Sequence, residues 1–262
     1  MTPYEFFLRE LRRRREGARL TQEELGKRIN FSGSHVSAVE LGNRPPKDDF
    51  LEAVDLAFDT GELFRRMWKD LIEDAAPAWL REWIEIERRA TLLRWFEPTF
   101  LPGLLQTEAY ARAVLSGGVL ADPDVINQRL ASRMERQSIL TREQPPTFVA
   151  VIDEGVLRRP LAPPAVMVEQ FEHLGKIGQL PHVRLHVVPA EVGMHAGLAG
   201  GFILAKGPEG QAAHLDSALR AYITVRADDI DSLQTRWEKL RSDALPRRAT
   251  LDLIREVAKT WT

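Results

Sequence analysis

Cysteine is absent from the 262 residues of the chain. This absence excludes disulfide bonds, thiolate catalysis and cysteine-ligated zinc, and it fits a reducing cytoplasm. No apolar run approaches the roughly 20 residues that a membrane-spanning helix needs, and no early charged-then-apolar segment suggests export. Internal repeats and low-complexity tracts are missing as well. We therefore expect a cytoplasmic globular protein with no role in a membrane.

The motifs of several common enzyme classes are also missing. The chain has no His-Glu-x-x-His zinc motif, no Gly-x-Gly-x-x-Gly or P-loop lysine pattern, and no Gly-x-Ser-x-Gly elbow. His182 and His186 are four apart on an expected strand. They are either two metal ligands or histidines whose hydrogen bonds are satisfied within the fold. Asp153-Glu154 follows an expected buried strand, where it either serves as a pair of active-site carboxylates or caps the next turn. We expect no enzyme activity, no cofactor and no metal.

Charge of one sign is not in large excess, since 36 Lys and Arg stand against 38 Asp and Glu. The distribution is mildly uneven, because residues 1–50 hold ten basic and eight acidic side chains. Four consecutive arginines at positions 12–15 form the densest basic run. This run indicates either a solvated helix face or a surface that meets phosphate groups.

Length and composition favour two domains. One hydrophobic core usually serves roughly 100–200 residues, and 44% of this chain is hydrophobic while 28% is charged. Helical periodicity breaks at Pro77. We place the boundary near residues 74–78 and expect one domain over 1–76 and another over 78–262.

The first 76 residues predict five short helices, because helix starts and stops recur along them. The start signals are capping residues or capping boxes: Thr2-Pro3-Tyr4-Glu5, Thr21-Gln22-Glu23-Glu24, Ser32, Asp48 and Thr60-Gly61-Glu62. Gly17 and Gly42 are expected to end the first and third helices. Asn30 tolerates a positive φ and suits the tight turn after the second helix.

Residues 78–262 predict a mixed α+β domain. The strand candidates are β-branched or alternating segments: 147–153, 182–189, 200–207, 221–226 and, more weakly, 212–218. Helices are expected at 78–90, 106–116, 123–142, 163–178, 228–244 and 247–261, and residues 92–103 as a short extended piece plus a loop. The fold class is thus an all-α five-helix N-terminal domain plus an α+β domain with a small, mostly antiparallel sheet of four or five strands.

Residues 20–46 meet the requirements of a helix-turn-helix. This motif needs two short helices at a steep angle, and the second must be exposed enough to enter the major groove. Four apolar side chains are expected to pack between the helices: Leu25, Ile29, Val36 and Val39. Three small or polar residues are expected on the outer side: Ser34, His35 and Ala38. The alternative is a helical hairpin of a purely structural bundle.

The same stretch resembles the helix-turn-helix of XRE-type (Cro/phage-repressor-like) regulators. The matching residues are Leu20-Thr21-Gln22-Glu23-Glu24-Leu25, Phe31-Ser32 and Val36-Ser37-Ala38-Val39-Glu40-Leu41-Gly42-Asn43-Arg44-Pro45-Pro46. Asn30 replaces the usual turn glycine and can adopt the same backbone geometry. Gly26 replaces the usual alanine, which weakens its helix by about 1 kcal/mol but lets the helices approach closely.

The resemblance implies DNA contacts at matching positions. Gln22 corresponds to a glutamine that bridges backbone and base, and Gly33 to a position where a longer side chain often reads a base. The implied base-edge readers are Ser34, His35 and Ala38, and the implied phosphate contacts are Ser32, Ser37, Asn43, Arg44 and Lys47. No base-edge reader can form a bidentate pair, so we expect weak direct readout, helped by DNA shape and by a dimer.

Glu40 lies at the DNA-facing end of the motif, where an acidic side chain is unsuited to a DNA contact. We expect it to pair internally with a basic residue such as Arg12 or Arg15. Part of the arginine run would then be structural.

Segments of the second domain look like the uncharacterised C-terminal domain of WhiJ-like actinobacterial regulators. They are residues 100–111, 133–137, 152–158 and 183–189. The resemblance implies a developmental or antibiotic-linked transcription regulator, often encoded beside a small acidic partner protein. This chain departs from its relatives at Ala213-His214-Leu215-Asp216, where they tend to carry a strand with Tyr and Glu.

The expected ligand- or partner-binding surface combines an aromatic loop with a basic helix face. Its residues are Trp95, Gln106, Arg133, Arg136 and Gln137. The last three lie three and four apart, on one side of a helix. Such a face can hold an acidic partner or an anionic ligand, or it can form a salt-bridged seam between the domains.

Together these patterns predict a homodimeric, cytoplasmic, sequence-specific regulator of transcription, a repressor that binds a double-stranded DNA operator. Its C-terminal domain would sense a small ligand or a protein partner. The alternatives are a plain dimerisation domain, a DNA-binding antitoxin-like protein that neutralises a small partner, and an enzyme fused to a DNA-binding module.

Overall fold

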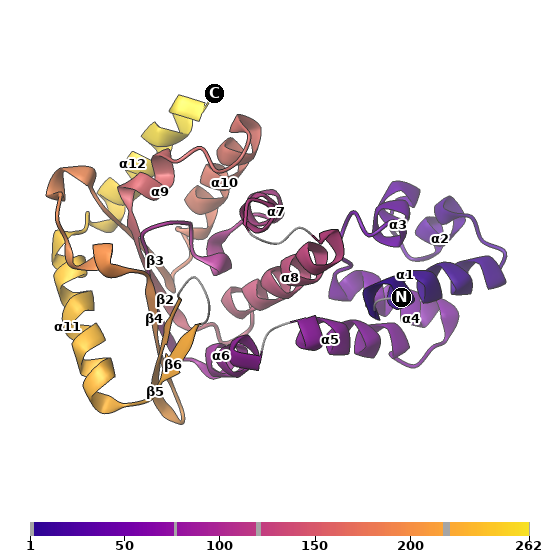
Figure 1. Cartoon of the computed structure of the whole chain (residues 1–262). Coiled ribbons are helices and arrows are strands. Elements are labelled where there is room, and N and C mark those ends of the chain that lie inside the picture. The colour runs from indigo at the N-terminus through magenta and orange to yellow at the C-terminus, as the bar shows by residue number, and fades with distance from the viewer. Residues whose placement is uncertain (1–2, 76–77, 119–121, 217–220, 262) are drawn as a thin grey trace. The chain divides into compact units, whose positions relative to one another are not determined.

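The computed structural model describes residues 3–75, 78–118, 122–216 and 221–261, without the side chains of residues 3 and 71–79 (Figure 1). The chain divides into two compact units. The first comprises Met1–Pro77 and Gly118–Glu135, and the second comprises Ala78–Gly117 and Arg136–Thr262. The sequence predicted two consecutive domains, whereas the chain returns to the first unit at Gly118–Glu135.

The first unit is all-α, as predicted. Its helices are α1 (Pro3–Gly17), α2 (Gln22–Arg28), α3 (Gly33–Glu40), α4 (Asp48–Phe58), α5 (Leu63–Ala75) and α8 (Pro123–Arg136), whose last residue belongs to the second unit. Thr2, the expected cap of α1, lies outside the described residues. The expected left-handed end at Gly17 is wrong: α1 continues through Gly17, and Arg19 has the positive φ of 57°. The amides of Arg19 and Leu20 bond to the carbonyls of Glu16 and Arg15, which closes the helix later.

The core of the first unit comes from the apolar faces of its helices. Its fully buried side chains include Tyr4, Phe7, Leu11, Leu25, Val36, Val39, Phe50, Val54 and Phe64. Ala131 of α8 belongs to the same cluster. Burial of a large apolar side chain stabilises a fold by roughly 1.5–3 kcal/mol, so these residues fix how the short helices pack.

The second unit is built around a six-stranded mixed sheet. The strands are β1 (Leu92–Glu97), β2 (Thr147–Asp153), β3 (Val183–Val188), β4 (Phe202–Gly207), β5 (Gly210–Leu215) and β6 (Tyr222–Thr224), in the order β3-β2-β1-β4-β5-β6. Strands β1, β2 and β3 are parallel, and the remaining three pairs are antiparallel. The α+β class is confirmed. Residues 92–97 form the strand that joins the parallel and antiparallel halves, not only a short extended piece.

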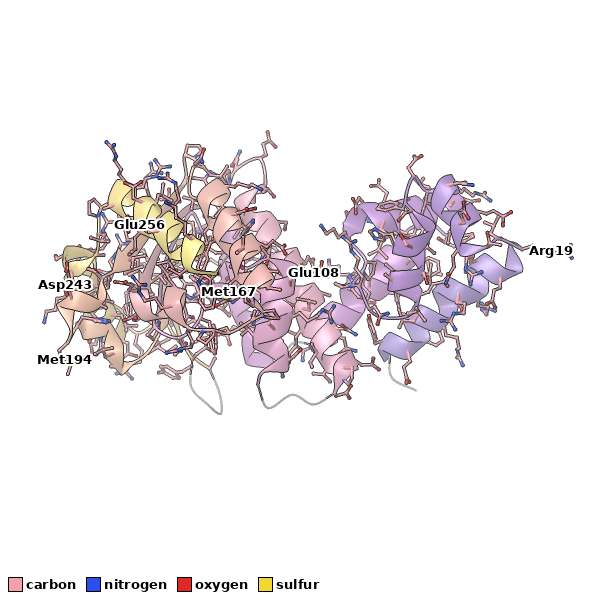
Figure 2. All side chains as sticks on the ribbon, turned by 90° about the horizontal axis from the view of Figure 1, so that it is seen from above. Arg19, Glu108, Met167, Met194, Asp243 and Glu256 are labelled. Carbon is pink, nitrogen blue, oxygen red and sulfur yellow. The ribbon has the colours of Figure 1, made fainter. Side chains whose placement is uncertain are left out.

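Helices cover both faces of this sheet (Figure 1). One face packs on α6 (Ala78–Arg89), α7 (Glu108–Ser116), α10 (Pro164–Ile177) and α12 (Arg247–Ala258), and the other on α11 (Ala227–Asp243). Alternation along β1 sends Leu93 and Trp95 to the first face and Phe96 to the second. Figure 2 marks Met167 of α10, which is fully buried, and Met194, which is 86% exposed after β3.

Short elements connect these strands and helices. They are η1 (Gly103–Leu105), η2 (Gln137–Leu140), α9 (Glu154–Arg158), η3 (Ala190–Val192), η4 (Ala196–Ala199) and η5 (Lys259–Trp261). The helix expected over 123–142 therefore ends at Arg136 and continues as the 3-10 turn η2. The weak strand candidate 212–218 is β5, although residues 217 and 218 lie outside the described residues.

Candidate DNA-binding surface

Helices α2 and α3 are held together by local signals that the sequence carries. Thr21 and Glu24 form a complete capping box at the start of α2. Asn30 supplies the positive φ of 59° in the turn, and the Ser32 hydroxyl accepts the amide of His35 at 3.1 Å to start α3. The expected inward residues Val36 and Val39 are fully buried. The predicted two-helix motif is therefore present, with both helix starts fixed by side chains.

Two glycines let α2 and the start of α3 approach closely. A Cβ at Gly26 would lie 2.7 Å from the carbonyl oxygen of Phe31 and 2.9 Å from the amide nitrogen of Gly33. A Cβ at Gly33 would lie 2.9 Å from Cα of Glu23. Position 26 therefore needs glycine for packing, which explains the departure from alanine. A side chain at position 33 would clash with α2, so only the backbone of Gly33 can contact DNA.

The outer side of α3 presents small groups. Ser32 and Ser34 are exposed, and their hydroxyl oxygens lie 2.9 Å apart, so one donates to the other. Ser37 and Ala38 are half-buried. The surface at the start of this helix thus combines hydroxyl groups with little steric bulk, and it can approach the edge of a base pair closely.

His35 differs from its neighbours because its ring belongs to an aromatic cluster. The imidazole stacks on Phe50 with centroids 5.3 Å apart and an interplanar angle of 11°, and it meets the edge of Phe31 at 4.9 Å. The sequence placed His35 on the outer face. Its half-buried ring also stabilises the contact between α3 and α4.

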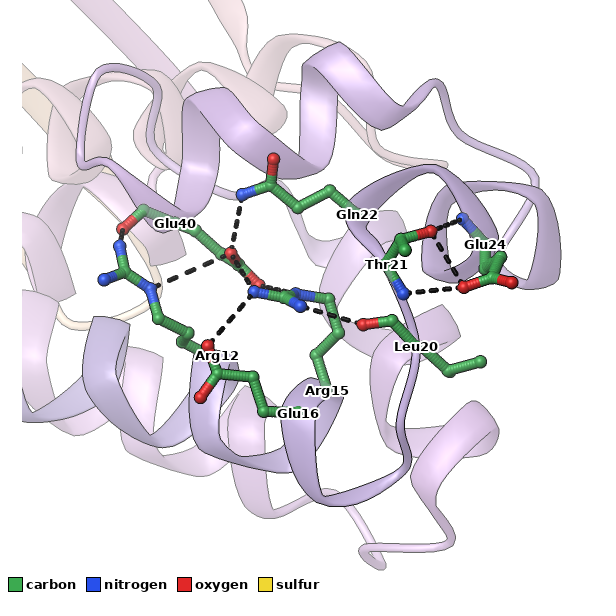
Figure 3. A network of polar contacts seen from close by, with 8 residues as sticks. All are labelled: Arg12, Arg15, Glu16, Leu20, Thr21, Gln22, Glu24 and Glu40. Atoms are coloured by element: carbon green, nitrogen blue, oxygen red, sulfur yellow. Dashed lines mark hydrogen bonds and ion pairs between the residues drawn. The ribbon is translucent and has the colours of Figure 1, made fainter.

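Behind the outer face, Glu40 is the centre of a polar network (Figure 3). Its side chain is fully buried, and Arg15 binds both carboxylate oxygens, with Nε donating at 2.7 Å and Nη2 at 3.1 Å. This pairing raises the pKa of Arg15 above its usual value. Arg12 adds a bond from Nη2 to the Glu40 carbonyl at 3.3 Å. The internal pairing predicted for Glu40 is confirmed, with Arg15 as the main partner.

Gln22 joins the same network. Its Nε2 donates to Oε2 of Glu40 at 2.8 Å, and the amide oxygen turns away from the network (Figure 3). The carboxylate therefore fixes which end of the Gln22 amide faces outward. No local pattern predicts this contact, because 18 positions separate the two residues.

Each arginine of the run at positions 12–15 contacts a glutamate within the first unit. Arg13 donates to both oxygens of Glu10 at 2.8 and 2.9 Å, and Arg14 donates to one of them at 3.0 Å. These bonds lower the pKa of Glu10, and the hydrogen bond from Arg13 has the largest effect. Arg12 donates to the backbone carbonyl of Glu40, and Arg15 donates to its carboxylate. The geometry favours a structural role for this run over a phosphate-binding patch.

The segment after α3 carries the other expected phosphate contacts. Gly42 ends the helix with a positive φ of 73°, and the amides of Asn43 and Arg44 both bond to the carbonyl of Ala38. Asn43 and Lys47 are exposed, and Arg44 is half-buried. These side chains follow α3 on a tightly bonded backbone, where flexible cations and amides can reach a phosphate.

Helix α8 supports this segment, which sequence reasoning missed. The Nδ2 of Asn127 donates to the carbonyl of Gly42 at 2.7 Å, and Asn127 is buried. No local pattern can announce a hydrogen bond across 85 positions. The contact fixes the end of α3 from outside the helix-turn-helix.

The residues expected to bind a ligand or partner in the second unit make internal contacts. Arg136 forms a two-pronged ion pair with the buried Glu87, with both N–O distances 2.8 Å. Gln137 donates to the carbonyls of Gly103 and Gln106 at 2.9 and 2.7 Å. The indole of Trp95 donates to Glu97 at 3.0 Å.

Gln106, the remaining member in the second unit, is 2% exposed and donates to the carbonyl of Leu101. Arg133 belongs to the first unit and the other four residues to the second. The structure thus joins Gln106 and Gln137, whose bonds secure the loop at residues 101–106, and the binding role of the set stays a prediction.

At the carboxyl end of β2, Asp153 and Glu154 make different contacts. Asp153 caps α9 through the amide of Gly155, and Glu154 accepts the amide of Ala190 at 2.9 Å. Asp153 also contacts Nε2 of His195 at 3.0 Å, while Nδ1 of that ring accepts the amide of Gly197. Both imidazole nitrogens are occupied. Asp153 therefore caps the turn as the capping interpretation predicts, whereas Glu154 begins α9 and bonds to another segment.

Metal ligation finds no support in the part of the chain that the structure describes. No group of three or more His, Cys, Asp or Glu residues there could hold a metal ion. His182 and His186 bond to carbonyls of different segments, Leu140 and Leu245, so their rings do not converge. Among the described helices, none is long and apolar enough to cross a membrane.

Comparison with protein families finds two matches, and the second runs through Gly118–Glu135, which the structure assigns to the first unit. Residues 7–66 match a helix-turn-helix domain, which suggests DNA binding. Residues 80–256 match a domain of unknown function (DUF5753). No curated protein and no solved structure matches the chain. Because the second match covers more than half of its residues, the chain belongs to the DUF5753 family, with a helix-turn-helix domain preceding that domain.

Proposed function

We propose that the protein is a sequence-specific DNA-binding regulator of transcription that reads an operator with α3. The observation that carries the proposal is the exposed hydroxyl pair of Ser32 and Ser34 at the start of a helix whose backbone is fixed on both sides. A rigid, sterically open helix start suits insertion into the major groove. DNA lies in the cytoplasm of an actinobacterial cell, which is where the protein would act.

In this proposal, base-edge and phosphate contacts come from different parts of the motif. Ser34 and Ala38 face the bases, and the outward oxygen of Gln22 accepts from a base amino group. Asn43, Arg44 and Lys47 contact phosphates, together with the amides at the helix N-termini. Ser32 and Ser37 complete the phosphate contacts. His35 adds one polar edge, and Gly33 allows close backbone approach.

The small base-reading surface favours a homodimer. Two motifs double the contacts, and a two-fold dimer would place half-sites about 34 Å apart. We infer that the protein is a repressor whose second unit senses a small ligand or a protein partner, in line with the resemblance to WhiJ-like regulators. A catalytic role is not part of the proposal: in the Asp153–His195 pair, Asp153 also caps α9 and His195 also accepts the amide of Gly197.

The test is fluorescence anisotropy of the full-length protein on its selected operator and on a shuffled duplex. Ser34→Ala should weaken operator binding about tenfold and leave the shuffled duplex unaffected, because it removes one base contact. Arg44→Ala should weaken both about equally and lower the salt dependence by about one counterion. His35 is left unchanged, since its ring also packs on Phe50.

Arg255→Ala provides the control. Arg255 is an exposed arginine of the second unit, paired with Asp252, and its loss should change neither affinity. Equal losses on both duplexes for Ser34→Ala would contradict base reading by α3.

A further inference from the structure

A corner of the β-sheet in the second unit gathers basic side chains on the face that α11 covers. Arg94 lies between Leu92 and Phe96 on β1, and both of these pack in the cluster on the α11 side. Alternation therefore places Arg94 on that face, and its guanidinium lies 6.0 Å from the ring of Trp237. Arg184 of β3 and Arg94 are both register partners of Val149, so they share a row.

Lys206 and Arg241 extend this group. Lys206 of β4 pairs with Leu92, which places it on the same face, diagonal to Arg94 and about 7–8 Å away. Arg241 follows Trp237 by one turn of α11, and its Nη1 lies 3.2 Å from Nε2 of His186. We call Arg94, Arg184, Lys206 and Arg241 the basic corner.

His186 shows that the electrostatic potential at the basic corner is positive. Its Nδ1 lies 2.9 Å from the carbonyl of Leu245, so Nδ1 carries the hydrogen and Nε2 accepts from Arg241. Burial lowers the pKa of His186, and the charges of Arg241 and Arg184 lower it further. The ring is thus held neutral beside two guanidinium groups.

The basic corner lacks the carboxylates that accompany the other arginine clusters. Arg184 donates only to the carbonyls of Pro181 and Val183, and no acidic side chain among the described residues forms an ion pair with any member of the corner. The nearby acid of α11, Glu238, is exposed and in no such pair. By contrast, each arginine at 12–15 and Arg136 has a nitrogen within 3.9 Å of a glutamate carboxylate oxygen.

Like charges at diagonal positions of a sheet repel one another, and half-buried guanidinium groups lose part of their hydration. A bound anion would offset both costs. Two strand spacings separate Arg94 from Arg184, roughly 9–10 Å between their backbones, which long side chains span around one phosphate or carboxylate group. Lys206 and Arg241 are exposed, so the corner is open to solvent.

We propose that the basic corner is a binding site for a small anionic ligand carrying a phosphate or carboxylate group. Arg94 and Arg184 provide the planar guanidinium contacts, and Lys206 and Arg241 add positive charge. The half-buried position of both arginines against Val149 and Trp237 favours a small anion over a long polyanion. This proposal names a site and a ligand class for the sensing role proposed above. Only the effect of the anion on DNA binding rests on that proposed function, because anion binding itself can be measured without DNA.

The experiment uses the full chain and inorganic pyrophosphate as the probe, at constant ionic strength set with chloride. Nuclear magnetic resonance of labelled histidine follows His186 during the titration. We expect saturable binding with a rise in the pKa of His186, because an anion favours the charged ring. The double variant Arg94→Gln/Arg184→Gln should bind at least about tenfold more weakly. Arg255→Gln, an exposed arginine of α12, should bind as the parent does.

Three outcomes would overturn the proposal. The first is no saturable change in His186. The second is the same response in the parent and the double variant, which indicates screening alone. The third is loss of operator affinity in the double variant without any effect of pyrophosphate, which assigns the corner to the DNA backbone. If pyrophosphate binds saturably but leaves operator affinity unchanged, the sensing role is refuted and the anion site stands.

Discussion

Replacing Glu40 by glutamine probes the network that supports the outer surface of α3. The Glu40 side chain is fully buried and Arg15 is only 11% exposed, so the substitution removes the buried counterion of this guanidinium and leaves only the more exposed Glu16, 3.6 Å away. Removing one partner of a buried ion pair costs about 3–5 kcal/mol. A domain is typically stable by only about 5–15 kcal/mol, so the loss should be large enough to increase local opening of α2 and α3.

The assay is hydrogen–deuterium exchange of the full-length protein, read on peptides that cover α2 and α3. Glu40→Gln should speed exchange there, while peptides of the second unit remain unchanged. Glu23→Gln is the matched control, because Glu23 lies in the same unit in an exposed pair with Lys27. That variant should exchange like the parent protein.

A double variant separates the ion pair from simple loss of packing. In Glu40→Gln/Arg15→Gln the buried unpaired charge is removed, so part of the lost protection should return. If Glu40→Gln exchanges no faster than Glu23→Gln, the central role assigned to the Glu40 network is refuted.

Three further predictions concern other parts of the fold. Gly26→Ala should destabilise the first unit in chemical denaturation although alanine favours helices, because its Cβ would lie 2.7 Å from the Phe31 carbonyl oxygen; a gain in stability would contradict this close approach. Asn127→Ala should speed amide exchange at the end of α3 by leaving the Gly42 carbonyl without its buried donor, a loss of about 1–3 kcal/mol; unchanged exchange there would show that α8 does not support α3. Acidification from pH 7.5 to 5.5 should destabilise the second unit, because burial lowers the pKa of His173 and His186. Below about pH 6.5 the histidines of the unfolded chain bind protons while those of the folded chain stay neutral, so the free energy of unfolding falls by up to about 1.4 kcal/mol per pH unit for each histidine. A urea-denaturation midpoint that does not change with pH would contradict this prediction.

The parts of the fold that sequence could predict are those specified by neighbouring residues. The capping box at Thr21, the turn at Asn30 and the cap at Ser32 are local, and each appears where the pattern placed it. Strand β2 spans the predicted residues 147–153 because a β-branched run between prolines and a polar turn has one interpretation.

Long-range contacts could not be predicted in the same way. The return of α8 to the first unit depends on Ala131 and Asn127, which resemble ordinary residues of a polar helix. Strand β1 was predicted only as a short extended piece, because Arg94 and Glu97 interrupt its apolar pattern and two prolines follow soon after. Its place in the sheet comes from pairing with β2 and β4, distant in the chain.

The candidate DNA-binding surface shows the same division. The internal pairing of Glu40 was predictable, because an acid at a DNA-facing end needs another explanation. The stacking of His35 on Phe50 was not, because helical periodicity assigns a side but cannot show that α4 extends under the ring. Gly33 likewise looked like an open position, and only the path of α2 shows what a side chain there would meet.

The most direct test of the central claim is selection of duplexes from a random-sequence library by the purified full-length protein. We predict enrichment of one sequence with two-fold related half-sites about one helical turn, or 34 Å, apart. The protein with Ser34→Ala should enrich it less. Recovery of unrelated duplexes, with no common sequence above the input library, would contradict the proposal that α3 reads an operator.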